Sequence, residues 1–188
     1  MKKLIAMALV LVMVCGMFAA CGKKEANDNK TEITADAVTV LTNIWNKVPE
    51  DSKFPVYGGD GIQMVDGAPG AYTDMEALTN QLIVPEDQKS NITEIASLFH
   101  GMMTNNFTCG VFKMAEGVDA AAFAQTMNDA VKNNQWMCGF PEELLIVSVD
   151  GGAYVLVAFG LSDVIALMNT AITEAYPQAE VKFTGNVM

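Results

Sequence analysis

The side chains with the clearest capacity for chemistry in this chain are two cysteines, Cys109 and Cys138. Outside the cytoplasm such a pair would form a disulfide, and the predicted fold puts both at the same end of a sheet. The alternative is two buried thiols, which behave as small hydrophobic side chains. A redox-catalytic pair is disfavoured, because that chemistry typically uses Cys-x-x-Cys at a helix N-terminus and neither cysteine has it.

A soft-metal site is the second possibility, around the only histidine, His100. Met102 and Met103 lie beside it, and thioether sulfur suits copper(I). However, the helix that we predict over residues 91–104 would turn both methionines into the core. Core packing is therefore the preferred account of these methionines.

The acidic residues form no recognisable catalytic or calcium site. Asp60, Asp66 and Asp74 lack the spacing of an EF-hand loop. Glu142 and Glu143 are adjacent, and neighbours that enter a strand point to opposite faces, so they cannot act as a pair. No nucleophile turn, zinc motif, phosphate loop or dinucleotide fingerprint occurs. We therefore expect a protein that is not an enzyme, with no catalytic residue, no metal and no cofactor.

Aromatic side chains in irregular stretches are candidates for recognition. Phe54, Tyr57 and Tyr72 lie in the Gly-, Pro- and Asp-rich stretch 54–72, which we interpret as a long loop, and Trp136 lies in a second stretch. Aromatic rings on loops give contact area at low entropic cost, so these four are our binding candidates. The alternative, that they cover the core, stays open.

The N-terminus predicts export and lipid attachment. Lys2 and Lys3 precede an apolar run, residues 4–14, which is too short to span a bilayer and is typical of a signal peptide. Phe18-Ala19-Ala20-Cys21 resembles the lipobox of bacterial lipoproteins, in which the cysteine is lipidated and becomes the mature N-terminus; Phe18 replaces the usual aliphatic residue. The alternatives are an ordinary signal peptide that leaves Cys21 as a free thiol, and a retained membrane helix.

Behind Cys21, residues 22–32 have no apolar side chain larger than alanine, so no burial could offset chain entropy. We therefore expect a signal peptide over residues 1–20, a lipidated Cys21 with a tether to residue 33, and one domain over residues 34–188. The lipid would hold that domain at the extracytoplasmic face of the cell membrane.

The charge balance argues against some partners. The formal net charge is −11, with 11 Lys and Arg against 22 Asp and Glu. Nucleic acid and anionic lipid headgroups are disfavoured, because binding either requires Lys and Arg to neutralise phosphate. Cationic partners remain compatible, although solubility is the simpler account of the charge.

The strongest fold signal is a β-hairpin over residues 143–160. Two β-branched, apolar runs flank Asp150-Gly151-Gly152, and glycine supplies the positive φ of a tight turn. The second run is apolar on both faces, which predicts a central strand in a sheet covered on both sides.

The remaining elements follow from periodicity and capping residues. Helices are predicted over 36–48, 73–83 and 91–104, then a strand over 107–114, a helix capped by Asp119, the hairpin, a helix capped by Ser162 and an edge strand over 180–184. The order from residue 107 is β-α-β-β-α-β. It predicts an α+β, ferredoxin-like four-stranded antiparallel sheet over residues 107–188, with an N-terminal helical cap and Gly-rich loop over residues 34–106.

Several segments together resemble a known group of proteins. They are Phe107-Thr108-Cys109-Gly110, Gln135-Trp136-Met137-Cys138-Gly139-Phe140-Pro141, the hairpin and Ala175-Tyr176-Pro177. They are similar to small lipoproteins of clostridial Gram-positive bacteria that carry a domain of unknown function. Some relatives are labelled bacteriocin transport accessory protein, a name associated with a thioredoxin-like group whose Cys-x-x-Cys is absent here. The resemblance implies no catalytic residues.

We therefore expect a non-enzymatic, lipid-anchored extracytoplasmic module that binds a partner protein or a small molecule. The alternative is a thiol-dependent accessory protein for export that acts through Cys109 and Cys138. A transporter-associated substrate-binding protein is a third option, but two lobes and a hinge usually need a longer chain.

Overall fold

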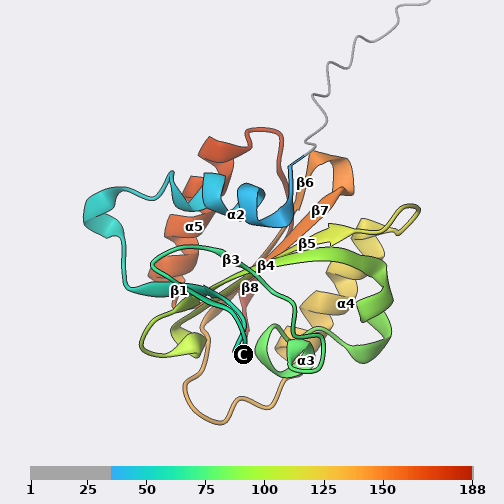
Figure 1. The fold of residues 1–188 in the computed structure, drawn as a ribbon, viewed down its shortest axis with the longest axis horizontal. Helices are drawn as coiled ribbons and strands as arrows, with labels where there is room; N and C mark the ends of the chain where they lie inside the picture. The colour runs from blue at the N-terminus through green and yellow to red at the C-terminus, as the bar shows by residue number, and fades with distance from the viewer. Residues whose placement is uncertain (1–34, 188) are drawn as a thin grey trace, which may run out of the picture. The chain divides into compact units, whose positions relative to one another are not determined.

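One antiparallel sheet of eight strands organises the computed structural model, which describes residues 35–187 (Figure 1). The strand order is β2-β1-β4-β5-β7-β6-β8, and β3 pairs with β4. The strands are β1 (Val56–Gly59), β2 (Met64–Asp66), β3 (Gly70–Ala71), β4 (Ile92–His100), β5 (Phe107–Met114), β6 (Glu143–Val149), β7 (Tyr154–Gly160) and β8 (Glu180–Asn186). The predicted signal peptide, the lipidated Cys21 and the tether lie outside the described residues.

Helices cover both faces of this sheet (Figure 1). One face carries α2 (Ala37–Trp45) and α5 (Ser162–Ala175), and the other carries α3 (Leu78–Gln81) and α4 (Ala120–Lys132). Each face has its own hydrophobic core. Within residues 35–187, no helix has the length and apolar character that a membrane crossing requires.

The predicted two-sided central strand is confirmed. β7 lies between β5 and β6, and every one of its residues is buried. Its side chains alternate between the two cores: Leu156 packs in the core under α2 and α5, whereas Val157 packs in the core under α4. The hairpin turn also forms as predicted, with Gly151 at φ 63°.

The predicted ferredoxin-like fold is wrong. In that fold the last strand returns beside the first, whereas β8 pairs with β6. The place beside β5 is occupied by β4, which pairs with β5 along nearly its whole length. The unit β5-α4-β6, with β7 inserted between its strands, is retained, but it belongs to a larger, eight-stranded sheet.

The predicted helix over residues 91–104 is also wrong, because strand β4 forms there. Ile92, Ile95 and Phe99 have helical spacing, but β4 is buried on both faces and so shows no alternation of polar and apolar residues. Ala96 and Leu98 pack towards α2, while Ile95 and Phe99 pack towards α3 and α4. A strand buried on both faces and a buried helix have similar apolar composition, so composition alone does not distinguish them.

The stretch 54–72, interpreted as a loop, contains the short strands β1, β2 and β3. β1 and β3 follow one another along the same edge of β4, and their backbones nearly touch. A Cβ atom on Gly58 would lie 2.1 Å from the backbone nitrogen of Gly70. Only glycine permits this approach, so the glycines that suggested a loop instead allow two strands to share one edge.

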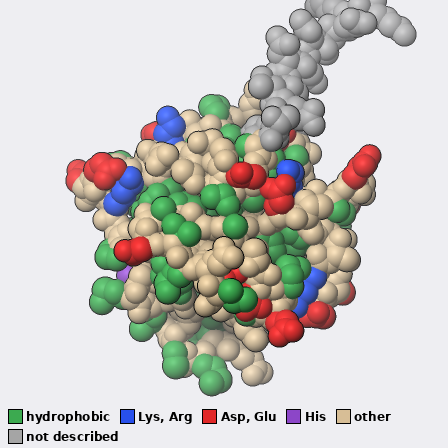
Figure 2. Space-filling model, in the orientation of Figure 1, with side chains coloured by type: hydrophobic (Ala, Val, Ile, Leu, Met, Phe, Trp, Pro, Cys, Tyr) green, Lys and Arg blue, Asp and Glu red, His purple; other side chains and the backbone are tan. Residues whose placement is uncertain are grey.

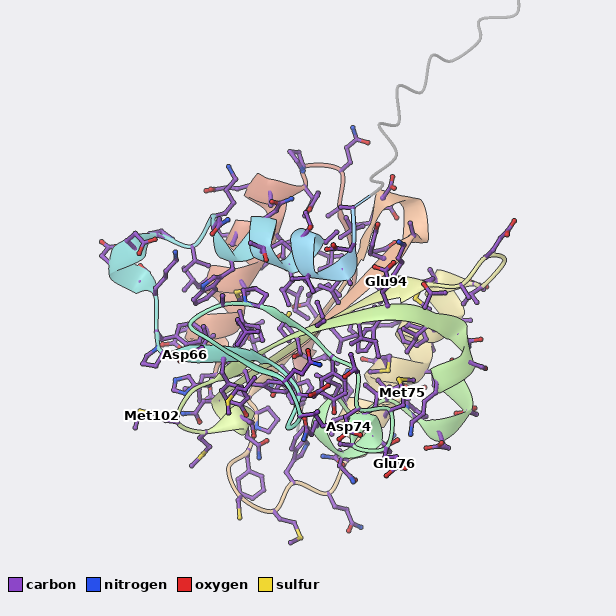
Figure 3. The ribbon with its side chains drawn as sticks, in the orientation of Figure 1. Asp66, Asp74, Met75, Glu76, Glu94 and Met102 are labelled. Atoms are coloured by element: carbon purple, nitrogen blue, oxygen red, sulfur yellow. The ribbon has the colours of Figure 1, made fainter. Side chains whose placement is uncertain are left out.

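Side-chain carboxylates cap the three longer helices. Asp36 accepts from the backbone nitrogen of Thr39 at the start of α2, and Asp119 caps α4 as predicted. The predicted cap at Ser162 is wrong in one respect: Ser162 is the first helical residue, and the Glu142 carboxylate accepts from both its backbone nitrogen and its hydroxyl. Figure 3 shows Glu94 near the start of α2, where it accepts from the backbone nitrogen of Ala37.

Asp60 is a buried carboxylate, only 2% exposed, that joins two turns. One oxygen accepts from the backbone nitrogens of Ile62 and Gln63, each at 2.8 Å. The other accepts from the backbone nitrogen and hydroxyl of Thr73 and from the backbone nitrogen of Asp74. Burial alone raises the pKa of Asp60, but these hydrogen bonds outweigh it and hold the pKa far below its usual range.

We expect Asp60→Asn to lower the free energy of unfolding by about 3 kcal/mol, because an amide cannot accept all these bonds. The pKa of Asp60 is lower in the folded than in the unfolded state. The carboxylate therefore stabilises the fold fully above its unfolded-state pKa of about 4, and progressively less as the pH falls below that value. Urea unfolding at several pH values measures this. Asp66→Asn, at an exposed site in β2, is the matched control. A difference from wild type that does not shrink in acid would contradict the assignment.

Candidate functional site

A recess lies over one end of the sheet, on the face that carries α3 and α4. Its floor is a single row across four neighbouring strands, because Tyr57 pairs with Phe99, Phe99 with Thr108, and Thr108 with Phe159. Residues in register point to the same face, so these four side chains form one continuous row. Phe99, Thr108 and Phe159 are almost fully buried, whereas Tyr57 is half-buried. The Tyr57 and Phe99 rings stack, with centroids 5.2 Å apart.

Segments from three other parts of the chain form the walls of this recess. They contribute Asn80 and Gln81 of α3, the following Ile83, Thr104 and Asn105 of the turn before β5, and Trp136 of the loop after α4. Figure 1 shows these three segments at the lower end of the molecule. We call the ten floor and wall residues the aromatic recess; its volume is about 170 Å³.

None of the ten lining residues is charged. Five of them carry a side-chain amide or an aliphatic hydroxyl, and the other five are aromatic or aliphatic. The surrounding surface differs: Figure 2 shows acidic side chains at several separate places on the visible face. A neutral lining cannot balance the charge of a buried ionic ligand, so the aromatic recess suits an uncharged molecule.

Trp136 is the wall residue with unsatisfied hydrogen-bonding capacity. Its ring lies against Phe159, with centroids 5.2 Å apart. Its indole nitrogen is buried and has no hydrogen-bond partner among the described residues; the only other such side-chain atom there is Oδ1 of Asn128. A buried donor without a partner costs about 1–3 kcal/mol, a cost that a ligand acceptor would remove.

Ile83 adds backbone strain to the same wall. Its φ is 57°, in the left-handed region that β-branched residues rarely adopt. Such a conformation costs about 1–2 kcal/mol and is found disproportionately at functional sites. An unpaired donor and a strained residue therefore occur together at one recess.

The four aromatic candidates separate in the structure. Tyr57 and Trp136 both line the aromatic recess. Tyr72 is buried behind it, where its hydroxyl donates to Gln81 Oε1 at 3.1 Å. Phe54 lies towards the opposite face, stacked on His100 at a centroid distance of 5.3 Å. Two candidates therefore belong to one site, and the other two pack elsewhere.

The histidine and its neighbouring methionines are arranged differently from the prediction. Met102 and Met103 are exposed in the turn after β4, because the helix that would have buried them does not form; Figure 3 shows Met102 at the edge of the molecule. His100 Nδ1 accepts from the backbone nitrogen of Met102. Within residues 35–187, no group of three His, Cys, Asp or Glu side chains could hold a metal ion.

The expected disulfide between Cys109 and Cys138 is not formed. Cys109 is fully buried in β5, under α2 and α5, whereas Cys138 is exposed in the loop after α4. Burial raises the pKa of the Cys109 thiol well above its ordinary value. Cys109 therefore behaves as a core side chain with little thiolate character.

Sequence reasoning missed most of the lining. Phe99 was placed on a helix, and Thr108 and Phe159 were assigned only to strands. Gln81, Asn80 and Thr104 lack any distinguishing motif. The one available signal was the pairing of strands, which would have put Tyr57, Phe99 and Phe159 in a row had β1 and β4 been recognised.

Comparison with known proteins gives no match to a protein-family model, to a curated protein or to a solved structure. The aromatic recess must therefore be interpreted from its own residues.

Strain at Ile83 predicts an unusual response to substitution. Ile83 and Ile92 are both half-buried against the same core, but Ile92 has an ordinary φ of −116°. Asparagine tolerates the left-handed region, so in Ile83→Asn the relief of backbone strain offsets part of the stability that is lost with the buried isoleucine side chain. We expect Ile83→Asn to be less destabilising than Ile92→Asn by about 1 kcal/mol or more in urea unfolding. Equal losses would show that Ile83 is not strained.

The two thiols should differ sharply in reactivity. We expect iodoacetamide to label Cys138 in the native protein and Cys109 only after denaturation, because a buried thiol with a raised pKa supplies neither access nor thiolate. Peptide mass mapping locates the label. A peptide that joins Cys109 to Cys138 before reduction would contradict the structure.

Proposed function

We propose that this protein is a non-enzymatic, lipid-anchored extracytoplasmic module that binds a small uncharged molecule in the aromatic recess. The observation that carries the proposal is the buried indole nitrogen of Trp136, which has no partner among the described residues although its residue lines a recess. Proteins rarely leave a buried donor unpaired, and a ligand acceptor would pair with it after a small movement of the indole ring.

The strain at Ile83 supports the same proposal. Natural chains lose stability at sites whose geometry serves binding, and Ile83 lies in the wall of the recess. The lipid anchor remains the expectation drawn from Cys21, as does the resemblance to small clostridial lipoproteins. In this proposal the anchor retains the domain at the cell surface while the recess is open to solutes.

The thiol-dependent alternative has weaker support. Thiol exchange requires an accessible thiolate, and Cys109 is fully buried with a raised pKa. Cys138 alone offers no resolving partner among residues 35–187. Thiol exchange through Cys109 and Cys138 is therefore the weaker proposal.

The test uses the two tryptophans, which give two separate indole N–H signals in a ¹H–¹⁵N spectrum of the full chain in detergent. Trp136→Phe assigns the signal of Trp136. Trp45 is buried under the opposite face and serves as the internal control. The probes are neutral monosaccharides, charged sugars, amino acids, nucleobases and small apolar rings.

We expect at least one neutral probe to shift the Trp136 signal saturably and to leave the Trp45 signal in place. If no probe class moves the Trp136 signal, or if both tryptophan signals move together, the recess is not a binding site and the proposal fails.

A further inference from the structure

The lining of the aromatic recess narrows the class of ligand; this step rests on the proposed function. Two properties are decisive: the lining has no charged residue, and its polar groups are mainly amides and hydroxyls. Charged ligands such as amino acids, phosphates and nucleotides would bury a charge without a counter-charge, which costs several kcal/mol or displaces a proton. These classes are therefore excluded as good ligands.

A wholly apolar ligand is also a poor fit. It would cover the side-chain amides of Asn80 and Gln81 and leave their donors without water or partner. Gln81 already accepts from Tyr72 through Oε1, so its remaining capacity is mainly that of the NH₂ donors. Asn105 is arranged in the complementary way: its nitrogen donates to the backbone oxygens of Cys138 and Gly139, which leaves Oδ1 to accept.

The recess therefore offers both donors and acceptors around aromatic rings. Asn80 and Gln81 supply amide donors, and Asn105 supplies an acceptor. A hydroxyl group both donates and accepts, so several hydroxyls around one ring can pair with such a mixed set. The half-buried rings of Tyr57 and Trp136 supply the apolar area against which the C–H face of a ring can pack.

Size restricts the ligand further. The recess holds about 170 Å³, below the range of about 300–1,000 Å³ typical of sites for drug-sized molecules. One six-membered ring with its substituents fits such a volume, whereas a chain of rings would project into solvent. We infer that the aromatic recess binds a single neutral sugar ring, a pyranose monosaccharide, with ring hydroxyls paired to the side-chain amides of Asn80, Gln81 and Asn105 and the ring packed beside Trp136.

The experiment titrates the full chain with matched sugars and follows the Trp136 indole signal. Glucose, galactose and N-acetylglucosamine are the neutral probes; glucuronate and glucosamine carry a negative or positive charge on the same ring. Adenine and cyclohexanol test a flat heterocycle and an apolar ring. We expect at least one neutral sugar to bind, and its charged counterparts to bind at least about tenfold more weakly, equivalent to about 1.4 kcal/mol.

A variant pair tests the amide contacts. Asn80→Leu removes an exposed amide at the recess, and Asn46→Leu makes the same change at an exposed site at the end of α2, on the opposite face. We expect Asn80→Leu to weaken sugar binding about tenfold and Asn46→Leu to leave it unchanged, with both variants folded as judged by the Trp45 signal.

The outcomes separate the inference from the proposed function. If adenine or cyclohexanol shifts the Trp136 signal and no sugar does, or if charged sugars bind as tightly as neutral ones, the sugar inference is overturned and a binding recess remains. If no probe shifts the signal, both fail. Equal effects of the two Asn variants would overturn the assigned amide contacts.

Discussion

The handedness of two crossover connections constrains the rest of this fold. The connection from β5 through α4 to β6 and the connection from β7 through α5 to β8 both step in the same direction along the sheet, each passing over one intervening strand. β5 and β7 run antiparallel. Crossovers are almost always right-handed, so equal steps from antiparallel strands place their helices on opposite faces, as α4 and α5 are (Figure 1). A ferredoxin-like sheet steps back from its third strand and so keeps both helices on one face.

Elements with a strong local sequence signal were predicted, whereas strand β4 and the order of the strands were not. The hairpin, β5, β8 and the helices α2, α4 and α5 carry strong local signals, and all were predicted close to their observed bounds. The strand β4 was not, because helices on both faces bury both its sides and remove the alternation that identifies a strand. Strand order was also beyond local reasoning, since nothing near β8 indicates that β4 already occupies the edge of β5. A single wrong element thus altered the predicted topology.

The residues of the aromatic recess were also only partly predictable from the sequence. Tyr57 and Trp136 were found from their residue type and irregular surroundings, but their being neighbours depends on β1, β4, β5 and β7 lying side by side in register. The recess is lined by α3, the turn before β5 and the loop after α4, and its floor consists of ordinary strand residues. Phe99 and Phe159 are core residues that also line the recess. A site of this kind has no motif, because it is produced by topology and not by a local sequence.

Two features in the wall of the aromatic recess lower the stability of the fold. By contrast, Asp60 accepts five hydrogen bonds, which hold the turns before β2 and after β3 in one arrangement. Both of its buried carboxylate oxygens are therefore fully hydrogen-bonded. Against that background, an unpaired indole donor at Trp136 and a left-handed Ile83 are two costs that simple substitutions would remove. Phenylalanine would abolish the unpaired donor, and glycine or asparagine would relieve the backbone. Both costs fall on the wall of one neutral recess, which is where a bound ligand could compensate for them.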